Sequence, residues 1–218
     1  MIIELQKIWI LLLKVCHYKD IVKKVFEEIF MVDVFDGVTF ELISIKDIRK
    51  EDLYGGYRLN ILSKLEENRT YITVELTTGD EITPREMRYS YNSIFENRKI
   101  NIMSYTLETV LAEKFHSVIT LGILTTRLKD YYDIYVLMND KKDMIDKNIL
   151  RLAIKNTFKN RNVIIDVDLF NNVVNEIEND NSMKIKWIYY QERNGYAKHI
   201  KFDNVIDSVK IILNLMEK

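Results

Sequence analysis

The first half of the chain alternates apolar and polar residues over three short segments, whereas the second half repeats apolar residues every three to four positions. Alternation is typical of half-buried strands, and the longer repeat is typical of amphipathic helices. One helical repeat also precedes the alternating segments. The pattern predicts a helix at 18–31, strands at 38–45, 57–65 and 71–76, and helices at 106–121, 145–158, 166–178, 184–192 and 205–216.

Turn residues separate the three predicted strands. Asp36-Gly37 precedes the first strand, Gly55-Gly56 the second and Asn68-Arg69 the third. Strands joined by short turns predict a mainly antiparallel or mixed sheet, and the 18–31 helix is expected to cover one face of it. The polar loop 77–84, which contains the only proline, begins the change from strands to helices.

The pattern therefore predicts an α+β fold in two parts. We expect a sheet domain at 1–104 and a helical domain at 105–218. At 218 residues the chain is long enough to bury a sizeable core.

Composition restricts the partners and the compartment. The 32 basic and 33 acidic residues give a net charge of -1, so the chain as a whole does not attract nucleic acid or an anionic membrane. A single cysteine, Cys16, excludes an internal disulfide and agrees with a reducing cytosol. The apolar run 8–13 is far shorter than the ~20 residues of a membrane span, and Glu4 argues against a signal peptide. We expect a cytoplasmic protein with no membrane partner.

One lysine falls within the apolar stripe of the helix predicted at 106–121. Lys114 lies one turn from both Val110 and Val118 of that stripe. An ammonium group in such a position either reaches the solvent along its aliphatic stem or meets an anion. Lys114 is therefore a candidate for binding an anionic group, and a lysine that extends to the surface is the alternative.

The next helical pattern carries charge at regular spacing. Arg127, Asp130 and Asp133 recur at i, i+3 and i+6 on one side of this helix. One interpretation is an Arg–Asp ladder on a solvated face, which stabilises a helix by only about 0.2–0.5 kcal/mol per pair. The other is that these charges join Lys114 in one functional cluster.

The strand predicted at 71–76 contains a carboxylate among apolar residues. Alternation puts Glu75 on the same side as Tyr71 and Thr73, opposite Ile72 and Val74. Glu75 is then either part of the polar face of a half-exposed strand or a ligand for a metal ion at the strand end.

Four segments together resemble a known family. In order along the chain they read GGYRLNI, ITVELTTGDEITP, YTLETVLAEKFHSVI and TTRLKDYYDIYVL. They are similar in order and spacing to the nucleotidyltransferase toxins of abortive-infection systems (AbiEii/AbiGii type). The resemblance covers roughly 38–137, and its most specific part is Ala-Glu-Lys followed by Arg-Leu-Lys-Asp-Tyr-Tyr-Asp.

The resemblance implies a polymerase-beta-like nucleotidyltransferase core followed by a helical domain. Members of the family transfer a nucleotide from a nucleoside triphosphate (NTP) with the help of Mg²⁺, act on tRNA in some cases, and are paired with an antitoxin. By the same resemblance, Lys114 binds the triphosphate, Arg127 and Lys129 support nucleotide binding, and Asp130 or Asp133 is the late catalytic aspartate. Glu75 stands where the family usually has a metal-binding Asp.

The chain lacks the early Asp-x-Asp motif that the family uses to hold Mg²⁺. The only Asp-x-Asp is Asp166-Val167-Asp168, at the start of a predicted helix, where a cap and a first-turn charge are expected. In a shifted reading frame, AT-rich codons turn Ile3–Lys14 into Arg-Ala-Thr-Lys-Asp-Met-Asp-Phe-Ile-Ile-Lys, which contains the motif. We hypothesise a frameshift, natural or from sequencing, which the nucleotide sequence tests directly.

The expected function is that of a toxin from a type IV (AbiE-like) toxin–antitoxin and phage-defence system that is truncated and catalytically incomplete. The alternative is a non-catalytic interaction protein that binds the cognate antitoxin through its helical domain. A nucleic-acid-binding module based on the basic helix around 147–161 is disfavoured by the near-neutral net charge.

Overall fold

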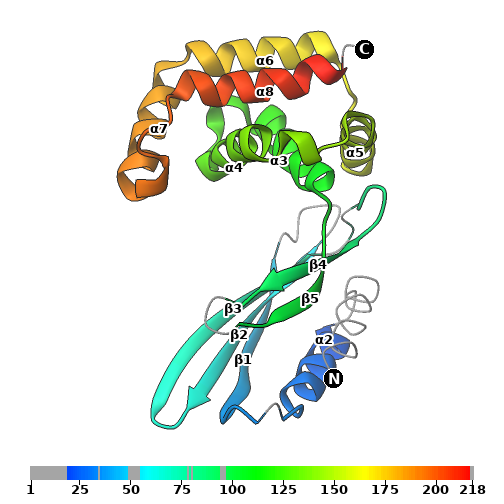
Figure 1. Cartoon of the computed structure of the whole chain (residues 1–218), viewed down its shortest axis with the longest axis vertical. Helices are drawn as coiled ribbons and strands as arrows, with labels where there is room; N and C mark the ends of the chain where they lie inside the picture. The colour runs from blue at the N-terminus through cyan, green and yellow to red at the C-terminus, as the bar shows by residue number, and fades with distance from the viewer. Residues whose placement is uncertain are drawn as a thin grey trace. The chain divides into compact units, whose positions relative to one another are not determined.

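The computed structural model describes residues 19–33, 35–48, 55–77, 79, 81–93 and 97–216. The chain separates into two compact units, which we call the sheet unit (1–80 and 88–104) and the helical unit (81–87 and 105–218) (Figure 1). The shifted-frame motif at Ile3–Lys14, the apolar run 8–13 and Cys16 lie outside the described residues.

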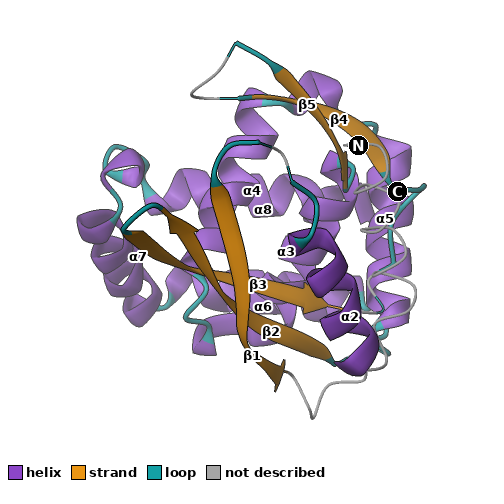
Figure 2. Ribbon diagram, turned by 90° about the horizontal axis from the view of Figure 1, so that it is seen from below, coloured by secondary structure: helices purple, strands orange, loops and turns teal. Residues whose placement is uncertain are grey.

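The sheet unit contains an antiparallel sheet in the order β1-β2-β3, covered on one face by helix α2 (Figure 2). Val22 and Phe26 of the helix pack against buried side chains of β2 and β3, including Leu59 and Leu76. The α+β fold, the helix and the three strands are thus confirmed. The bounds are α2 Lys19–Phe30, β1 Val38–Ile48, β2 Gly56–Leu65 and β3 Asn68–Thr77.

Glycines mark two points where this sheet requires them. Gly37 has φ +74°, and the adjacent Asp36 carboxylate accepts a hydrogen bond from the Val38 N–H at 2.9 Å, which forms the predicted turn before β1. Gly56 begins β2 close to β3, where a Cβ atom would lie only 2.3 Å from the carbonyl oxygen of Leu76. A side chain at position 56 would therefore push the two strands apart.

Two strands were not predicted. β4 (Met87–Asn92) and β5 (Lys99–Ser104) pair with each other in a separate two-stranded sheet. Every residue of β4 is exposed, including Tyr89 and Tyr91. Strand prediction depends on one buried face, and β4 has none.

The helical unit is built around one apolar core to which all six of its α-helices contribute. The predicted caps are present: Asp166, the first residue of the lone Asp-x-Asp, accepts a hydrogen bond from the Leu169 N–H at 3.0 Å at the start of α6. No helix in the described part of the chain is long and apolar enough to span a membrane. The helices are α3 Leu107–Leu121, α4 Leu128–Asp140, α5 Lys147–Asn160, α6 Val167–Asn179, α7 Asn181–Arg193 and α8 Phe202–Met216, with 3-10 turns η1 Gly122–Leu124, η2 Lys142–Met144 and η3 Gly195–Ala197.

The core of the helical unit predicts a large cost for truncating Phe115. Its ring is fully buried and lies 6.1 Å from the ring of Phe158 and 6.4 Å from that of Phe170, measured between centroids. We expect Phe115→Ala to lower the free energy of unfolding by about 3–5 kcal/mol, because it leaves a cavity. Leu124→Ala is the control, since Leu124 is 83% exposed and should change stability by less than about 0.5 kcal/mol. Urea denaturation checks both, and equal effects would contradict the core assignment.

Candidate functional site

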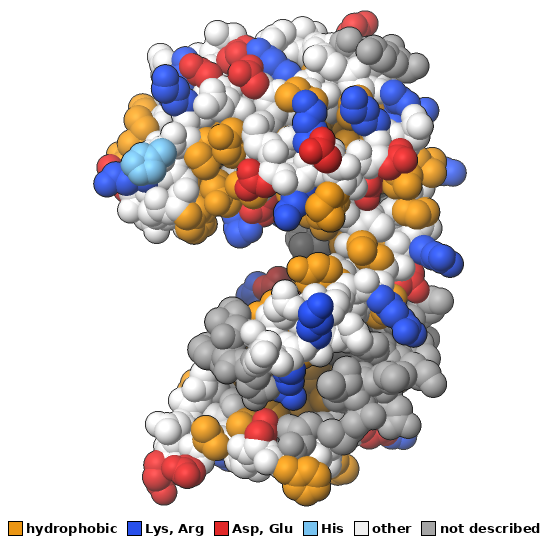
Figure 3. Space-filling view, in the orientation of Figure 1, with side chains coloured by type: hydrophobic (Ala, Val, Ile, Leu, Met, Phe, Trp, Pro, Cys, Tyr) orange, Lys and Arg blue, Asp and Glu red, His pale blue; other side chains and the backbone are white. Residues whose placement is uncertain are grey.

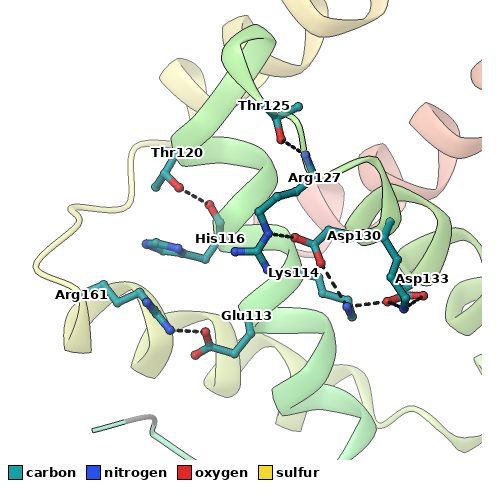
Figure 4. A network of polar contacts seen from close by, with 10 residues as sticks. Glu113, Lys114, His116, Thr120, Thr125, Arg127, Asp130, Asp133 and Arg161 are labelled. Carbon is teal, nitrogen blue, oxygen red and sulfur yellow. Dashed lines mark hydrogen bonds and ion pairs between the residues drawn. The ribbon is translucent and has the colours of Figure 1, made fainter. Parts of the chain in front are cut away.

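Lys114 points from α3 toward two carboxylates of α4. Its Nζ atom lies 3.1 Å from Oδ1 of Asp130 and 2.6 Å from Oδ2 of Asp133 (Figure 4). The Lys114 side chain is 20% exposed and that of Asp130 only 6%. The lysine in the apolar stripe therefore meets anions and does not extend into the solvent.

Two further cations complete this group. Nε of Arg127 lies 2.8 Å from Oδ2 of Asp130, an ion pair that lacks the alignment of a hydrogen bond. Nζ of Lys129 donates to both oxygens of Asp133, at 2.9 and 2.7 Å. The Arg127 and Lys129 side chains are 56% and 67% exposed, so the cations at the edge are open to solvent while the central one is not.

We call these five residues the Lys114 cluster. Three cations and two carboxylates give the cluster a formal charge of +1. The structure thus brings together all the residues predicted from α3 and α4, and the intrahelical Arg127–Asp130 ladder forms part of the same group. The neighbouring Tyr131 is buried. Burial raises the pKa of its hydroxyl, the negative charge of Asp130 raises it further, and the hydroxyl stays protonated.

Sequence inspection missed the aromatic residues beside this cluster. Tyr132 of α4 lies with its ring 4.7 Å from that of Tyr196 and 6.3 Å from that of Tyr190, which come from η3 and α7. The hydroxyl groups of Tyr190 and Tyr196 are 3.0 Å apart. Burial, the hydrogen bond to Tyr196 and the charge of Asp133 raise the pKa of Tyr190. Tyr132 directly precedes Asp133 in α4, so the aromatic group borders the Lys114 cluster.

A second polar group lies between α3 and α5 (Figure 4). Glu113 accepts a hydrogen bond from Nη2 of Arg161 at 2.5 Å and another from the Thr157 hydroxyl at 3.3 Å. His116 packs edge-on against Phe158, with ring centroids 4.8 Å apart. Burial, reinforced by the positive charge of Arg161, lowers the His116 pKa to about 4, so the imidazole is neutral at pH 7.

Glu75 lies on β3 of the sheet unit, opposite Arg58 of β2. Nε and Nη2 of Arg58 donate to the same Glu75 oxygen, Oε1, at 2.8 and 2.5 Å. No group of three or more His, Cys, Asp or Glu residues in the described part of the chain is arranged to hold a metal ion. A divalent cation needs several oxygen ligands, so the described residues do not fit a magnesium site.

The comparison with known families agrees with the residues gathered at this site. The family model described as nucleotidyl transferase AbiEii toxin, type IV toxin–antitoxin system, matches residues 16–208, which is most of the chain. The chain belongs to the AbiEii toxin family. The Lys114 cluster lies within the matched range, and the predicted family resemblance is confirmed. The search of curated proteins found no match.

The partly buried His116 imidazole predicts how the stability of this AbiEii-family chain depends on pH. An unfolded histidine binds its proton below about pH 6.5, whereas His116 in the folded chain does so only near pH 4. Between these values the unfolded state holds more protons, so stability falls as the pH falls. Because the ring is only partly buried, we expect a loss of about 1–2 kcal/mol over this range.

His116→Phe preserves the ring and removes the titration, so this variant should lose less stability than the parent chain between pH 6.5 and 4.5. Denaturant unfolding at both pH values gives the two differences. The same loss in parent and variant would show that His116 does not carry the effect.

Proposed function

We propose that this chain binds an NTP at the Lys114 cluster. The observation that carries the proposal is a largely buried lysine held between two carboxylates, with two exposed cations beside it. Membership of a nucleotidyltransferase family makes the triphosphate the natural anion for such a group. Arg127 and Lys129 are the exposed cations and meet the phosphates first.

The charges of the cluster indicate how binding proceeds. Asp130 and Asp133 repel a triphosphate as long as their charges are not compensated. Each carboxylate has two cationic partners, because Arg127 also pairs with Asp130 and Lys129 also pairs with Asp133. Lys114 can therefore turn toward a phosphate oxygen while both carboxylates keep a partner. Arg127 supplies a planar guanidinium suited to two parallel contacts with phosphate.

We further propose that this chain does not transfer the nucleotide. The chemistry of this family needs paired carboxylates that hold metal ions, and the described residues offer no such group. The single Asp-x-Asp of the sequence caps α6 through Asp166 and is committed to that helix. By family resemblance, the acceptor of a catalytically complete relative is an RNA such as tRNA.

The alternative function is binding of a cognate antitoxin without catalysis. Exposed apolar side chains on the helical unit favour it, since Leu124 is 83% and Ile164 86% exposed. Pulldown with the product of the neighbouring gene distinguishes the two functions, because the alternative requires capture of that protein without NTP binding.

The proposal predicts that Arg127→Ala weakens NTP binding about tenfold or more, because a charged hydrogen bond to phosphate contributes about 1.5–3 kcal/mol. Lys114→Met should weaken it at least as much. Lys155→Ala, at an exposed position on α5, is the control and should leave affinity unchanged. Anisotropy titration of a fluorescent NTP analogue measures all three. Unchanged affinity in both cluster variants would reject the site.

The proposal also predicts no incorporation of radiolabelled nucleotide into RNA by this chain with Mg²⁺ present. Total RNA with each of the four α-labelled NTPs covers the acceptors and nucleotides that the sequence leaves open. Labelling above a no-protein background that disappears in Lys114→Met would show that the chain is catalytically complete.

A further inference from the structure

Positive charge is concentrated in two segments of the helical unit, residues 147–161, which contain five lysines and arginines and no acidic residue, and residues 184–201. Residues 184–201 contain five lysines and arginines and a single acidic residue, Glu192, in a chain whose net charge is -1. The segment covers most of α7, the turn η3 and the residues that lead to α8. Its cations are Lys184, Lys186, Arg193, Lys198 and Lys201.

These cations, like Lys155 and Lys159 of α5, have no carboxylate partner among the described residues, so the tyrosines that lie among them distinguish the segment. Elsewhere Lys210 pairs with Glu178 at 2.6 Å, and Arg161 pairs with Glu113 at 2.5 Å. Within the described part of the chain, no salt bridge involves the cations of residues 184–201. Lys186 is held in place by the carbonyl oxygens of Ile123 and Thr125, at 2.7 and 3.1 Å. The charge of this segment is thus available to an external anion.

Two surface depressions flank α7. The first, of about 430 Å³, is lined by Lys186, Tyr189, Tyr190 and Arg193, which recur at i, i+3, i+4 and i+7 on one side of the helix. The second, of about 370 Å³, has Lys184, Lys198 and Lys201 in its wall. In Figure 3, blue cationic and orange apolar side chains lie side by side at the end of the helical unit that contains α7. We call the lining of both depressions the α7 surface.

Aromatic rings are exposed among these cations. Tyr189 is 58% and Tyr196 57% exposed, so both side chains present surface to the solvent. Tyr190 and Tyr196 also contact Tyr132 of α4, next to Asp133. The α7 surface is therefore continuous with the edge of the Lys114 cluster, within one unit of the structure.

We propose that the α7 surface binds single-stranded nucleic acid. Cations without partners would contact the phosphates, and the exposed tyrosines would stack on unpaired bases, which is how proteins hold single strands without reading their sequence. A duplex would keep its bases away from the rings. This proposal rests on the proposed function in one respect. The end of the bound strand would lie beside the NTP site, where a nucleotide acceptor has to be.

Binding of short fluorescein-labelled RNA and DNA single strands, measured by anisotropy over a range of salt concentrations, tests the surface without requiring catalysis. The double variant Arg193→Glu/Lys198→Glu should bind at least tenfold more weakly. Its plot of log affinity against log salt should be flatter by about 1.4, because each lost phosphate contact contributes about 0.7. The matched control is Lys155→Glu/Lys159→Glu, which makes the same charge change at exposed positions on α5 and should leave affinity within about twofold.

Tyr189 tests stacking separately. Tyr189→Ala should weaken binding about tenfold and Tyr189→Phe by less than about twofold, because phenylalanine keeps the ring. Tighter binding of RNA than of DNA would identify RNA as the ligand, and equal binding would leave both as ligands of the same surface.

No binding of either strand, or equal loss in the α5 control, would overturn the proposal. So would unchanged strand binding in the Arg193→Glu/Lys198→Glu variant combined with loss of antitoxin capture, because the surface would then be a protein interface. Arg127→Ala separates this proposal from the NTP site, since it should lose NTP affinity and keep strand affinity.

Discussion

A positive charge inside a helical core is the constraint on which the site depends. Lys114 lies in the apolar stripe of α3, where Asp130 and Asp133 approach it from α4 as ion-pair partners. Removing one partner from a pair this buried typically costs about 3–5 kcal/mol, because the remaining charge has lost its solvation. The packing of α3 against α4 and the charge balance of the cluster are therefore coupled, and neither can change alone.

The same constraint explains why the cluster is suited to exchange partners. Arg127 and Lys129 lie at its exposed edge and each shares a carboxylate with Lys114. A phosphate oxygen can replace a carboxylate at Lys114 without leaving Asp130 or Asp133 unpaired. Tyr132 and Tyr190 border the cluster on the side of α7, where Lys186 and Arg193 line a surface depression.

Apolar periodicity was sufficient to predict the main elements and four residues of the Lys114 cluster, and the family resemblance added Lys129. Lys114 was identified because a charge interrupts an apolar stripe, and Asp130 and Asp133 because they recur at helical spacing. Tyr190 and Tyr196 were missed because their proximity to α4 depends on how α7 packs, which spacing within one helix does not reveal. The strands β4 and β5 were missed because β4 has no buried face. The Arg58 partner of Glu75 follows from strand register, which the sequence alone did not define.

The two units differ in what they contribute to the function. The helical unit contains the cations expected to meet a triphosphate, whereas the sheet unit offers Glu75 paired with Arg58 and, among its described residues, no metal-binding group. The assignment of Glu75 to a metal stays a prediction. Membership of the AbiEii family gives the class of chemistry, and the Lys114 cluster is the place where we propose that this chain takes part in it.

A crystal structure of the chain with a non-hydrolysable NTP analogue tests the central claim most directly. The account predicts a phosphate oxygen within about 3.2 Å of the Lys114 Nζ atom, with Arg127 on the same triphosphate and Asp133 still paired with Lys129. A triphosphate bound elsewhere, with Lys114 still paired only with Asp130 and Asp133, would contradict it.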